Sequence, residues 1–164
     1  MPAERTLWYF AYASNLNRAI FSERRGMRPL ASRRGRLDNY RLSFNLPIGP
    51  GERGVANVEP EAGAHVWGVV YLLACEDCDR LDRSEGVHVG VYRRMAVDVT
   101  VDDEAVIAAF TYRSSWTTEG RKPSARYLGL ILAGARDHEL PAEYVRFLES
   151  LERARDEREP GHGV

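Results

Sequence analysis

His65-Val-Trp-Gly-Val-Val-Tyr-Leu-Leu73 carries the strongest strand pattern in the chain. Its β-branched and aromatic residues favour the pleated, half-buried surface of a sheet. Working outward, we expect further strands over residues 7–12, 36–46, 55–58, 89–101 and 105–112, the last two joined as a hairpin through Asp102-Asp103-Glu104. Residues 47–54 hold three Gly and two Pro, which is typical of a loop.

Helices are expected in four places. Asn15 can cap a short helix that follows the first strand and runs to about Arg25. Residues 75–84 have polar helix composition, and Gly86 marks the point where that helix stops. Two further helices open at Pro123 and Pro141 and carry apolar residues at helical spacing: Tyr127, Leu130, Ile131 and Gly134 in one, and Tyr144, Phe147, Leu148 and Leu151 in the other.

The order of these elements decides the fold class. Successive strands without helices between them disfavour a doubly wound parallel sheet. The order favours an α+β fold, a small mixed, strongly curved β-sheet or barrel flanked by helices. A length of 164 residues suits one domain, which we place over residues 1–152. Residues 153–164 form a charged C-terminal tail that we expect to fray.

The composition argues against several classes of protein. The chain is 44% hydrophobic and 29% charged with a formal net charge of −1, whereas a dedicated nucleic-acid binder usually shows an excess of Lys and Arg. No run approaches the ~18 apolar residues that a bilayer span needs. Residues 1–6 carry no apolar segment of a secretory signal. We therefore expect no nucleic-acid partner, no membrane association and a cytoplasmic location.

One stretch is rich in arginine. Eight Arg lie between Arg18 and Arg41, against only Glu23 and Asp38. Such a stretch could form a patch that binds phosphate, or a solvated face balanced by acids elsewhere. We favour the solvated face.

The two cysteines lie close together, in the order Cys75-Glu76-Asp77-Cys78. Such a pair could be redox-active or half of a zinc site. Tetrahedral zinc needs four ligands, and the sequence has no second Cys pair and no closely spaced His pair. Glu76 and Asp77 should also raise the thiol pKa, which opposes formation of a reactive thiolate. We expect neither metal nor redox chemistry here.

The turn Tyr12-Ala13-Ser14-Asn15-Leu16 is the first place where chemistry could lie. The start of a helix presents free N–H groups and a positive dipole end, which suit a carboxylate or a developing oxyanion. The alternative is an ordinary capped helix start.

Glu85 is the second candidate. At the last turn of a helix it lies near the negative end of the dipole, and any burial further destabilises the carboxylate and makes it a stronger base. A general base needs that tuning. The alternative is a solvated Glu at a helix C-terminus.

Tyr127, in Pro123-Ser-Ala-Arg-Tyr127, is the third candidate. Its hydroxyl could hydrogen-bond a ligand, although an aromatic residue at a helix start is more often part of a core.

Taken together, these segments resemble the gamma-glutamylcyclotransferases. Tyr9-Phe-Ala-Tyr-Ala-Ser-Asn-Leu16 is similar to their Tyr-Gly-Ser-Asn loop, and Leu81-Asp-Arg-Ser-Glu-Gly-Val87, continuing through Gly90 to Tyr92, is similar to the stretch with their catalytic Glu. The resemblance runs in order over roughly residues 7–148. Further matching segments are Val66-Trp-Gly-Val-Val-Tyr71, Pro123-Ser-Ala-Arg-Tyr127, Gly134-Ala135 and Leu140-Pro-Ala-Glu-Tyr144.

The resemblance implies a cyclising reaction in a small mixed β-barrel. A γ-glutamyl amino acid or amine is converted to 5-oxoproline and the released amine, with no cofactor and no metal. Glu85 is the implied catalytic residue, acting as acid and base. The implied substrate-binding residues are Tyr12, Ala13, Ser14, Asn15, Leu16, Tyr92 and Tyr127. The implied partner is the small γ-glutamyl substrate, and the resemblance also allows a homodimer.

Ala13 departs from the family, which usually has Gly there. Ala at a position with φ > 0 would cost ~1–2 kcal/mol, and its methyl group would crowd a ligand that approaches the backbone. We predict a negative φ for Ala13.

Alternative functions remain open on the sequence. Cyclotransfer on a γ-glutamyl amine or a γ-glutamyl pathway intermediate would use the same base and turn. The glutathione-specific relatives carry a Gly-Ser-Leu type of loop, so the Ser14-Asn15-Leu16 of this chain places that activity lower. A non-catalytic small-molecule binder on the same fold is the alternative from another class.

Overall fold

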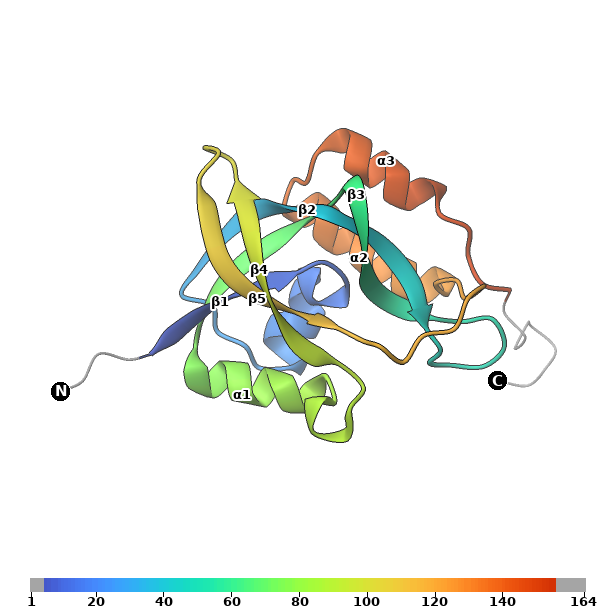
Figure 1. The fold of residues 1–164 in the computed structure, drawn as a ribbon, viewed down its shortest axis with the longest axis horizontal. Coiled ribbons are helices and arrows are strands. Elements are labelled where there is room, and N and C mark those ends of the chain that lie inside the picture. The colour runs from blue at the N-terminus through green and yellow to red at the C-terminus, as the bar shows by residue number, and fades with distance from the viewer. Residues whose placement is uncertain (1–4, 156–164) are drawn as a thin grey trace.

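The computed structural model describes residues 5–155 and contains a closed five-stranded barrel (Figure 1). The strand order around the barrel is β1-β3-β2-β4-β5. β1 and β5 close it through a parallel pair, whereas the other neighbours are antiparallel. The strands are β1 (Thr6–Ala11), β2 (Ala31–Leu46), β3 (Val55–Ala74), β4 (Arg93–Val101) and β5 (Val106–Arg113).

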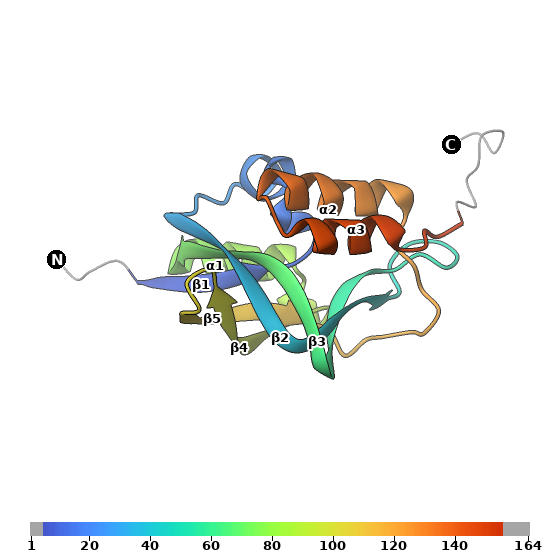
Figure 2. The ribbon, with the colours of Figure 1, turned by 90° about the horizontal axis from the view of Figure 1, so that it is seen from above.

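Three α-helices flank the barrel, α1 (Cys75–Ser84), α2 (Ala125–Asp137) and α3 (Ala142–Ser150). α2 and α3 lie side by side along the strands β2 and β3 (Figures 1 and 2). α1 packs against β1 and β3. The expected α+β fold, a small mixed barrel flanked by helices, is confirmed.

Two predicted strands are one. The segments expected separately over residues 55–58 and 65–73 belong to the single long strand β3, which pairs with β2 along most of its length. The β2–β3 register breaks between Asp38 and Tyr40, where Asn39 has φ 65° and faces Gly63, with φ 83°. The Gly63 N–H donates to Asn39 Oδ1 over 3.1 Å. This bulge bends the two strands without ending them.

The prediction of one short helix after the first strand is wrong, because two different helical turns occupy this segment. Residues 14–16 form one 3-10 turn (η1, Ser14–Leu16), and a π-helix follows (η2, Ala19–Arg24). Asn15 caps neither, because its amide turns inward to other side chains. Asn17 takes the capping role, since its Oδ1 accepts from the Ala19 N–H over 3.0 Å.

The strand predicted over residues 89–101 begins later, at Arg93. Gly86 and Gly90 both have positive φ, 71° and 78°, and enclose a short 3-10 turn (η3, Val87–Val89). The Val91 N–H returns to the Gly86 carbonyl over 3.0 Å. Residues 86–91 therefore fold back as a compact loop directly after α1.

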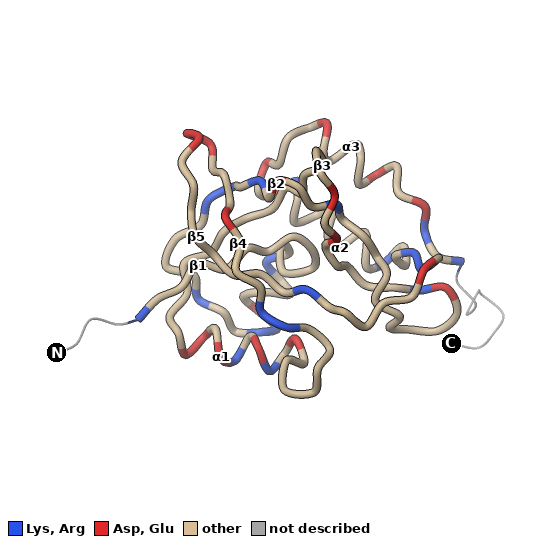
Figure 3. Tube along the Cα trace, viewed as in Figure 1, with Lys and Arg blue, Asp and Glu red and all other residues tan. Residues whose placement is uncertain are grey.

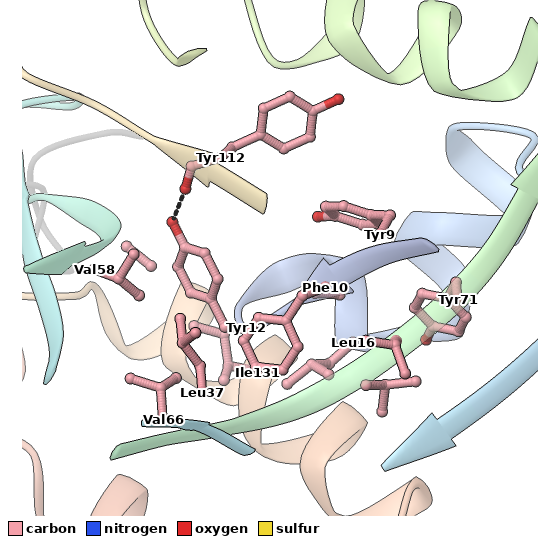
Figure 4. Close-up of a cluster of buried hydrophobic side chains, with 14 of the residues drawn as sticks. Tyr9, Phe10, Tyr12, Leu16, Leu37, Val58, Val66, Tyr71, Tyr112 and Ile131 are labelled. Atoms are coloured by element: carbon pink, nitrogen blue, oxygen red, sulfur yellow. Dashed lines mark hydrogen bonds between the residues drawn. The ribbon is translucent and has the colours of Figure 1, made fainter. Parts of the chain in front are cut away.

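The core fills the barrel and its contact with α2. Its largest fully buried side chains include Phe10, Phe21, Leu16, Leu128 and Ile131. Figure 4 shows Phe10, Tyr12 and Leu16 from the β1–η1 segment lying close to Ile131 of α2. The end of β1 is thereby held between the barrel and this helix.

Acids balance the arginine-rich stretch. Arg33 and Arg34 pair with Asp103 and Asp102 of the β4–β5 hairpin, both over 3.3 Å. Figure 3 shows basic and acidic residues interspersed along the strands. The arrangement agrees with a solvated face.

Part of the predicted C-terminal tail is described. The Ala154 N–H donates to the Pro123 carbonyl over 2.8 Å, so the first residues of the tail are held against the start of α2. Residues 156–164 lie outside the described part of the chain.

None of the helices in residues 5–155 is long and apolar enough to cross a bilayer.

Candidate active site

A pocket opens where β1 passes into η1, beside the end of α1 and the start of α2. Of the eight residues predicted for the site, seven line this pocket. Leu16 does not: its side chain is buried in the core, 1% exposed. The lining consists of Tyr9, Tyr12, Ala13, Ser14, Asn15, Ala56, Glu85, Tyr92, Tyr112 and Tyr127, and we call it the inner chamber.

Glu85 is the buried acid of the inner chamber. It follows the last residue of α1, and its N–H completes that helix by donating to the Leu81 carbonyl over 2.9 Å. Gly86, in the left-handed region, then turns the chain away. The Glu85 side chain is only 14% exposed. Burial raises its pKa above the ordinary carboxyl value, while Arg25 and the hydrogen bond from Asn15 partly offset that rise.

The two carboxylate oxygens of Glu85 differ. Oε1 accepts a hydrogen bond from Asn15 Nδ2 over 2.9 Å and lies 3.8 Å from Arg25 Nη1. Within residues 5–155, Oε2 has no hydrogen-bond partner. Because Asn15 holds Glu85 through Oε1, Oε2 can accept a proton from a bound ligand.

Asn15 connects Glu85 to the barrel. Its Nδ2 donates both to Glu85 and to the Tyr9 hydroxyl, each over 2.9 Å. Its Oδ1 is buried and has no protein partner in the described residues. Asn15 therefore orients the carboxylate and retains a free acceptor beside it.

The turn that carries Asn15 is fixed against α2. A Cβ atom on Gly134 would lie 2.5 Å from the Leu16 carbonyl carbon, so only glycine permits this approach. Ala13 has φ −137°, which confirms the predicted negative value. Alanine therefore avoids the cost of a left-handed backbone at the position where the family usually has Gly.

The backbone of Ala56 in β3 forms hydrogen bonds with the hydroxyls of two of the tyrosines. The Tyr92 hydroxyl donates to the Ala56 carbonyl over 2.5 Å, and the Ala56 N–H donates to the Tyr127 hydroxyl over 3.0 Å. The Tyr12 hydroxyl instead donates to the Tyr112 carbonyl over 2.7 Å (Figure 4). Burial raises the pKa of Tyr12, Tyr92 and Tyr127, so all three remain neutral phenols at neutral pH.

A second cavity of about 260 Å³ adjoins the first, and we call it the outer chamber. The two chambers share Ser14, Glu85, Tyr92 and Tyr127. The outer chamber adds Arg25, Ile48, Val55, Ser84, Gly86 and Val91. Glu85 therefore stands on the boundary between the two.

The cysteine pair lies away from this pocket. Cys75 and Cys78 are both free thiols. The pKa of Cys78 is raised to about 11, mainly by burial rather than by Glu76 and Asp77 as the sequence suggested. No cluster of three or more His, Cys, Asp or Glu suited to a metal occurs in residues 5–155.

Comparison with known proteins decides the family. Residues 65–148 match the AIG2-like family. The gamma-glutamylcyclotransferase of Bos taurus is 32% identical over 151 residues, covering 88% of this chain and 78% of the bovine protein. That of Homo sapiens is 32% identical over 158 residues, covering 92% and 81%. The chain belongs to the gamma-glutamylcyclotransferase family.

The comparison with solved structures leads to the same family as the sequence comparison. A solved structure described as a gamma-glutamyl cyclotransferase matches with a TM-score of 0.80 at 28% identity, covering 92% of this chain and 90% of that one. This member of the gamma-glutamylcyclotransferase family is therefore an enzyme of the cyclotransferase type, and the two chambers at Glu85 form its candidate active site.

Nine lining residues of this gamma-glutamylcyclotransferase-family pocket were not predicted as site residues. Three belong to the inner chamber, Tyr9, Ala56 and Tyr112, and six to the outer chamber, Arg25, Ile48, Val55, Ser84, Gly86 and Val91. Tyr9 stands inside the segment that carries the resemblance, so the motif itself could have included it. Ala56 acts through its backbone, which leaves no side-chain signal in a sequence. Tyr112 ends a predicted strand, and its hydroxyl donates to Asp82 over 2.6 Å.

Proposed function

We propose that this enzyme converts a γ-glutamyl amino acid to 5-oxoproline and the free amino acid, with Glu85 as general base and general acid. The observation that carries the proposal is the buried Glu85 carboxylate, which lines the pocket with a raised pKa and has one oxygen without a hydrogen-bond partner among residues 5–155. Family membership supports the reaction class.

The first step is proton removal from the substrate. Glu85 Oε2 accepts a proton from the α-ammonium group, and the free acceptor Asn15 Oδ1 can hold a second N–H of the same group. The first N–H groups of the turn at Ser14 lack intrahelical partners and suit the α-carboxylate. The glutamyl head is thereby oriented by both of its charges.

Ring closure follows. The freed amine attacks the δ-carbonyl carbon, forming the new C–N bond, and the carbonyl oxygen takes up negative charge. The hydroxyls of Tyr9 and Tyr127 line the chamber, and neither donates its proton to an acceptor within residues 5–155, so both can donate to that oxygen. Because the attack is intramolecular, positioning can supply up to ~7–11 kcal/mol of the acceleration.

Release completes the reaction. The bond between the δ-carbon and the leaving nitrogen breaks as Glu85 returns its proton to that nitrogen. Glu85 then takes the second proton of the attacking nitrogen, which becomes the lactam N–H, and passes it to the released amine, which leaves as an ammonium group. The products are 5-oxoproline and the amino acid, and the carboxylate of Glu85 is regenerated.

The test follows 5-oxoproline and the released amino acid from γ-glutamyl-alanine. We expect the two products in equal amounts. N-acetyl-γ-glutamyl-alanine, whose amine cannot attack, is the matched control and should give neither product. Release of alanine from the acetylated substrate would show a hydrolase instead, and no product from any γ-glutamyl amino acid in a panel would overturn the proposal.

A further inference from the structure

The outer chamber adjoins the inner chamber at Glu85, the proposed catalytic residue. If the glutamyl head occupies the inner chamber, the scissile amide lies at Glu85, which both chambers share. The group attached to the leaving nitrogen then extends into the outer chamber. Its walls are mostly apolar, with Ile48, Val55 and Val91, and Arg25 is the one cation among the lining residues.

The Arg25 side chain has hydrogen-bonding capacity that no group within residues 5–155 uses. Its Nε is buried and has no hydrogen-bond partner in the described residues. Its Nη1 lies 3.8 Å from Glu85 Oε1, too far for a hydrogen bond. Asn15 already holds that carboxylate oxygen over 2.9 Å. No second acid forms an ion pair with Arg25 among residues 5–155.

The Arg25 guanidinium lines the outer chamber close to Glu85, which suits a carboxylate on the leaving group of the substrate. In a γ-glutamyl amino acid, one carbon atom separates the leaving nitrogen from the α-carboxylate of the leaving residue. A carboxylate so close to Glu85 would add a second negative charge, which only a neighbouring cation can compensate. A planar Arg fork matches a carboxylate with two parallel hydrogen bonds.

We propose that Arg25 binds the α-carboxylate of the leaving amino acid, and that the enzyme therefore selects γ-glutamyl amino acids over γ-glutamyl amines. The inference rests on the proposed function. The apolar walls at Ile48, Val55 and Val91 further favour a leaving residue with an uncharged side chain.

The test compares two substrates that differ only in this charge, γ-glutamyl-alanine and γ-glutamyl-alaninamide. We expect the wild type to prefer the acid roughly 10- to 100-fold in kcat/KM, the range for hydrogen bonds to a charged group. Arg25→Gln should lower kcat/KM for the acid by that factor and change it much less for the amide.

The ratio of the two kcat/KM values separates recognition from other effects of Arg25. If the substitution only changed the basicity of Glu85, kcat/KM would change by the same factor for both substrates and the ratio would stay constant. Arg24→Gln is the matched control, because Arg24 is the adjacent residue, is exposed and lines neither chamber. It should retain the wild-type ratio.

Each outcome decides one of the two proposals. Wild-type enzyme that makes no 5-oxoproline from either substrate, or from any other γ-glutamyl amino acid of the panel, overturns the proposed function. Wild-type enzyme that uses acid and amide equally keeps the function and overturns the role of Arg25. An unchanged ratio in Arg25→Gln, with circular dichroism showing a folded protein, overturns it as well.

Discussion

At the scale of single residues, the site depends on how burial, Arg25 and Asn15 act on the negative charge of the Glu85 carboxylate. Burial of Glu85 disfavours its carboxylate, and Asn15 and Arg25 restore part of the lost stabilisation. The balance leaves the pKa raised, so Glu85 is a stronger base than an exposed glutamate yet remains ionised once the pH exceeds that value.

The pH dependence of kcat/KM should report this balance. Protonated Glu85 cannot accept the substrate proton, so activity should fall about tenfold per pH unit below the pKa of Glu85. The midpoint of that acidic limb should lie above the ordinary value of 4.5. Because Arg25 lowers the pKa of Glu85, Arg25→Gln should move the midpoint higher still. A midpoint at or below the ordinary value would contradict the burial argument.

Stability should respond to the same charge. Between the ordinary and the raised pKa, the folded state binds more protons than the unfolded chain, so stability falls as the pH rises through that window. Glu85→Gln removes the buried charge and should raise Tm at pH 7, by about 2–4 °C for each kcal/mol in a domain of this size. Thermal unfolding at several pH values checks this, since the gain should shrink as the pH falls below the ordinary carboxyl pKa.

At the scale of elements, the catalytic turn is positioned by a close approach to α2. The backbone of Leu16 lies against Gly134. The same turn places the Asn15 side chain within hydrogen-bonding distance of Glu85. Ser124 fixes the start of the same helix by accepting from the Tyr127 N–H over 3.1 Å. α2 therefore holds both the turn and one pocket tyrosine.

Gly134→Ala should therefore affect both stability and activity. The added Cβ would lie 2.5 Å from a backbone carbon, so the turn must shift, at a cost of about 1–3 kcal/mol in the free energy of unfolding. We expect a lower Tm together with a lower kcat/KM for 5-oxoproline formation.

Gly129→Ala is the matched control in the same helix. A Cβ there meets no atom within 4 Å. This variant should gain about 0.5–1 kcal/mol from helix propensity and keep full activity. If Gly134→Ala behaved like Gly129→Ala, the turn would not depend on that contact.

Local patterns made part of this structure predictable. The β-branched and aromatic residues of 65–73 predict the strand, and Gly86 after Glu85 predicts the end of α1. Glu85 as a base follows from the same helix end. The contact of Asn15 with Glu85 spans 70 residues, and no local pattern contains it. The continuity of β3 through its bulge likewise depends on pairing with β2, which periodicity alone does not show.

At the scale of the whole molecule, barrel closure assembles the site. The lining comes from β1, η1, the start of β3, the end of α1, the approach to β4, the end of β5 and the start of α2. These segments meet because β1 pairs with both β3 and β5 and closes the sheet. The site therefore exists only when the barrel is closed.

Unfolding should accordingly be one cooperative event. Trp8 lies in β1 and Trp67 in β3, whereas the third tryptophan, Trp116, is exposed and follows β5. In a Trp116→Phe variant, tryptophan fluorescence therefore reports the closure of the barrel, while far-ultraviolet circular dichroism reports all elements. The two urea transitions should coincide, and loss of activity should follow the same curve. Separate transitions would divide residues 1–152 into more than one folding unit.

The central claim is that Glu85 moves the protons of the cyclisation. The direct measurement is kcat/KM for 5-oxoproline formation from γ-glutamyl-alanine at pH 7, with wild type and Glu85→Gln side by side and both shown to be folded. Glutamine keeps the shape and cannot take the proton, so we expect a loss of about 10²- to 10⁴-fold. A Glu85→Gln enzyme within a few-fold of wild type would contradict the account.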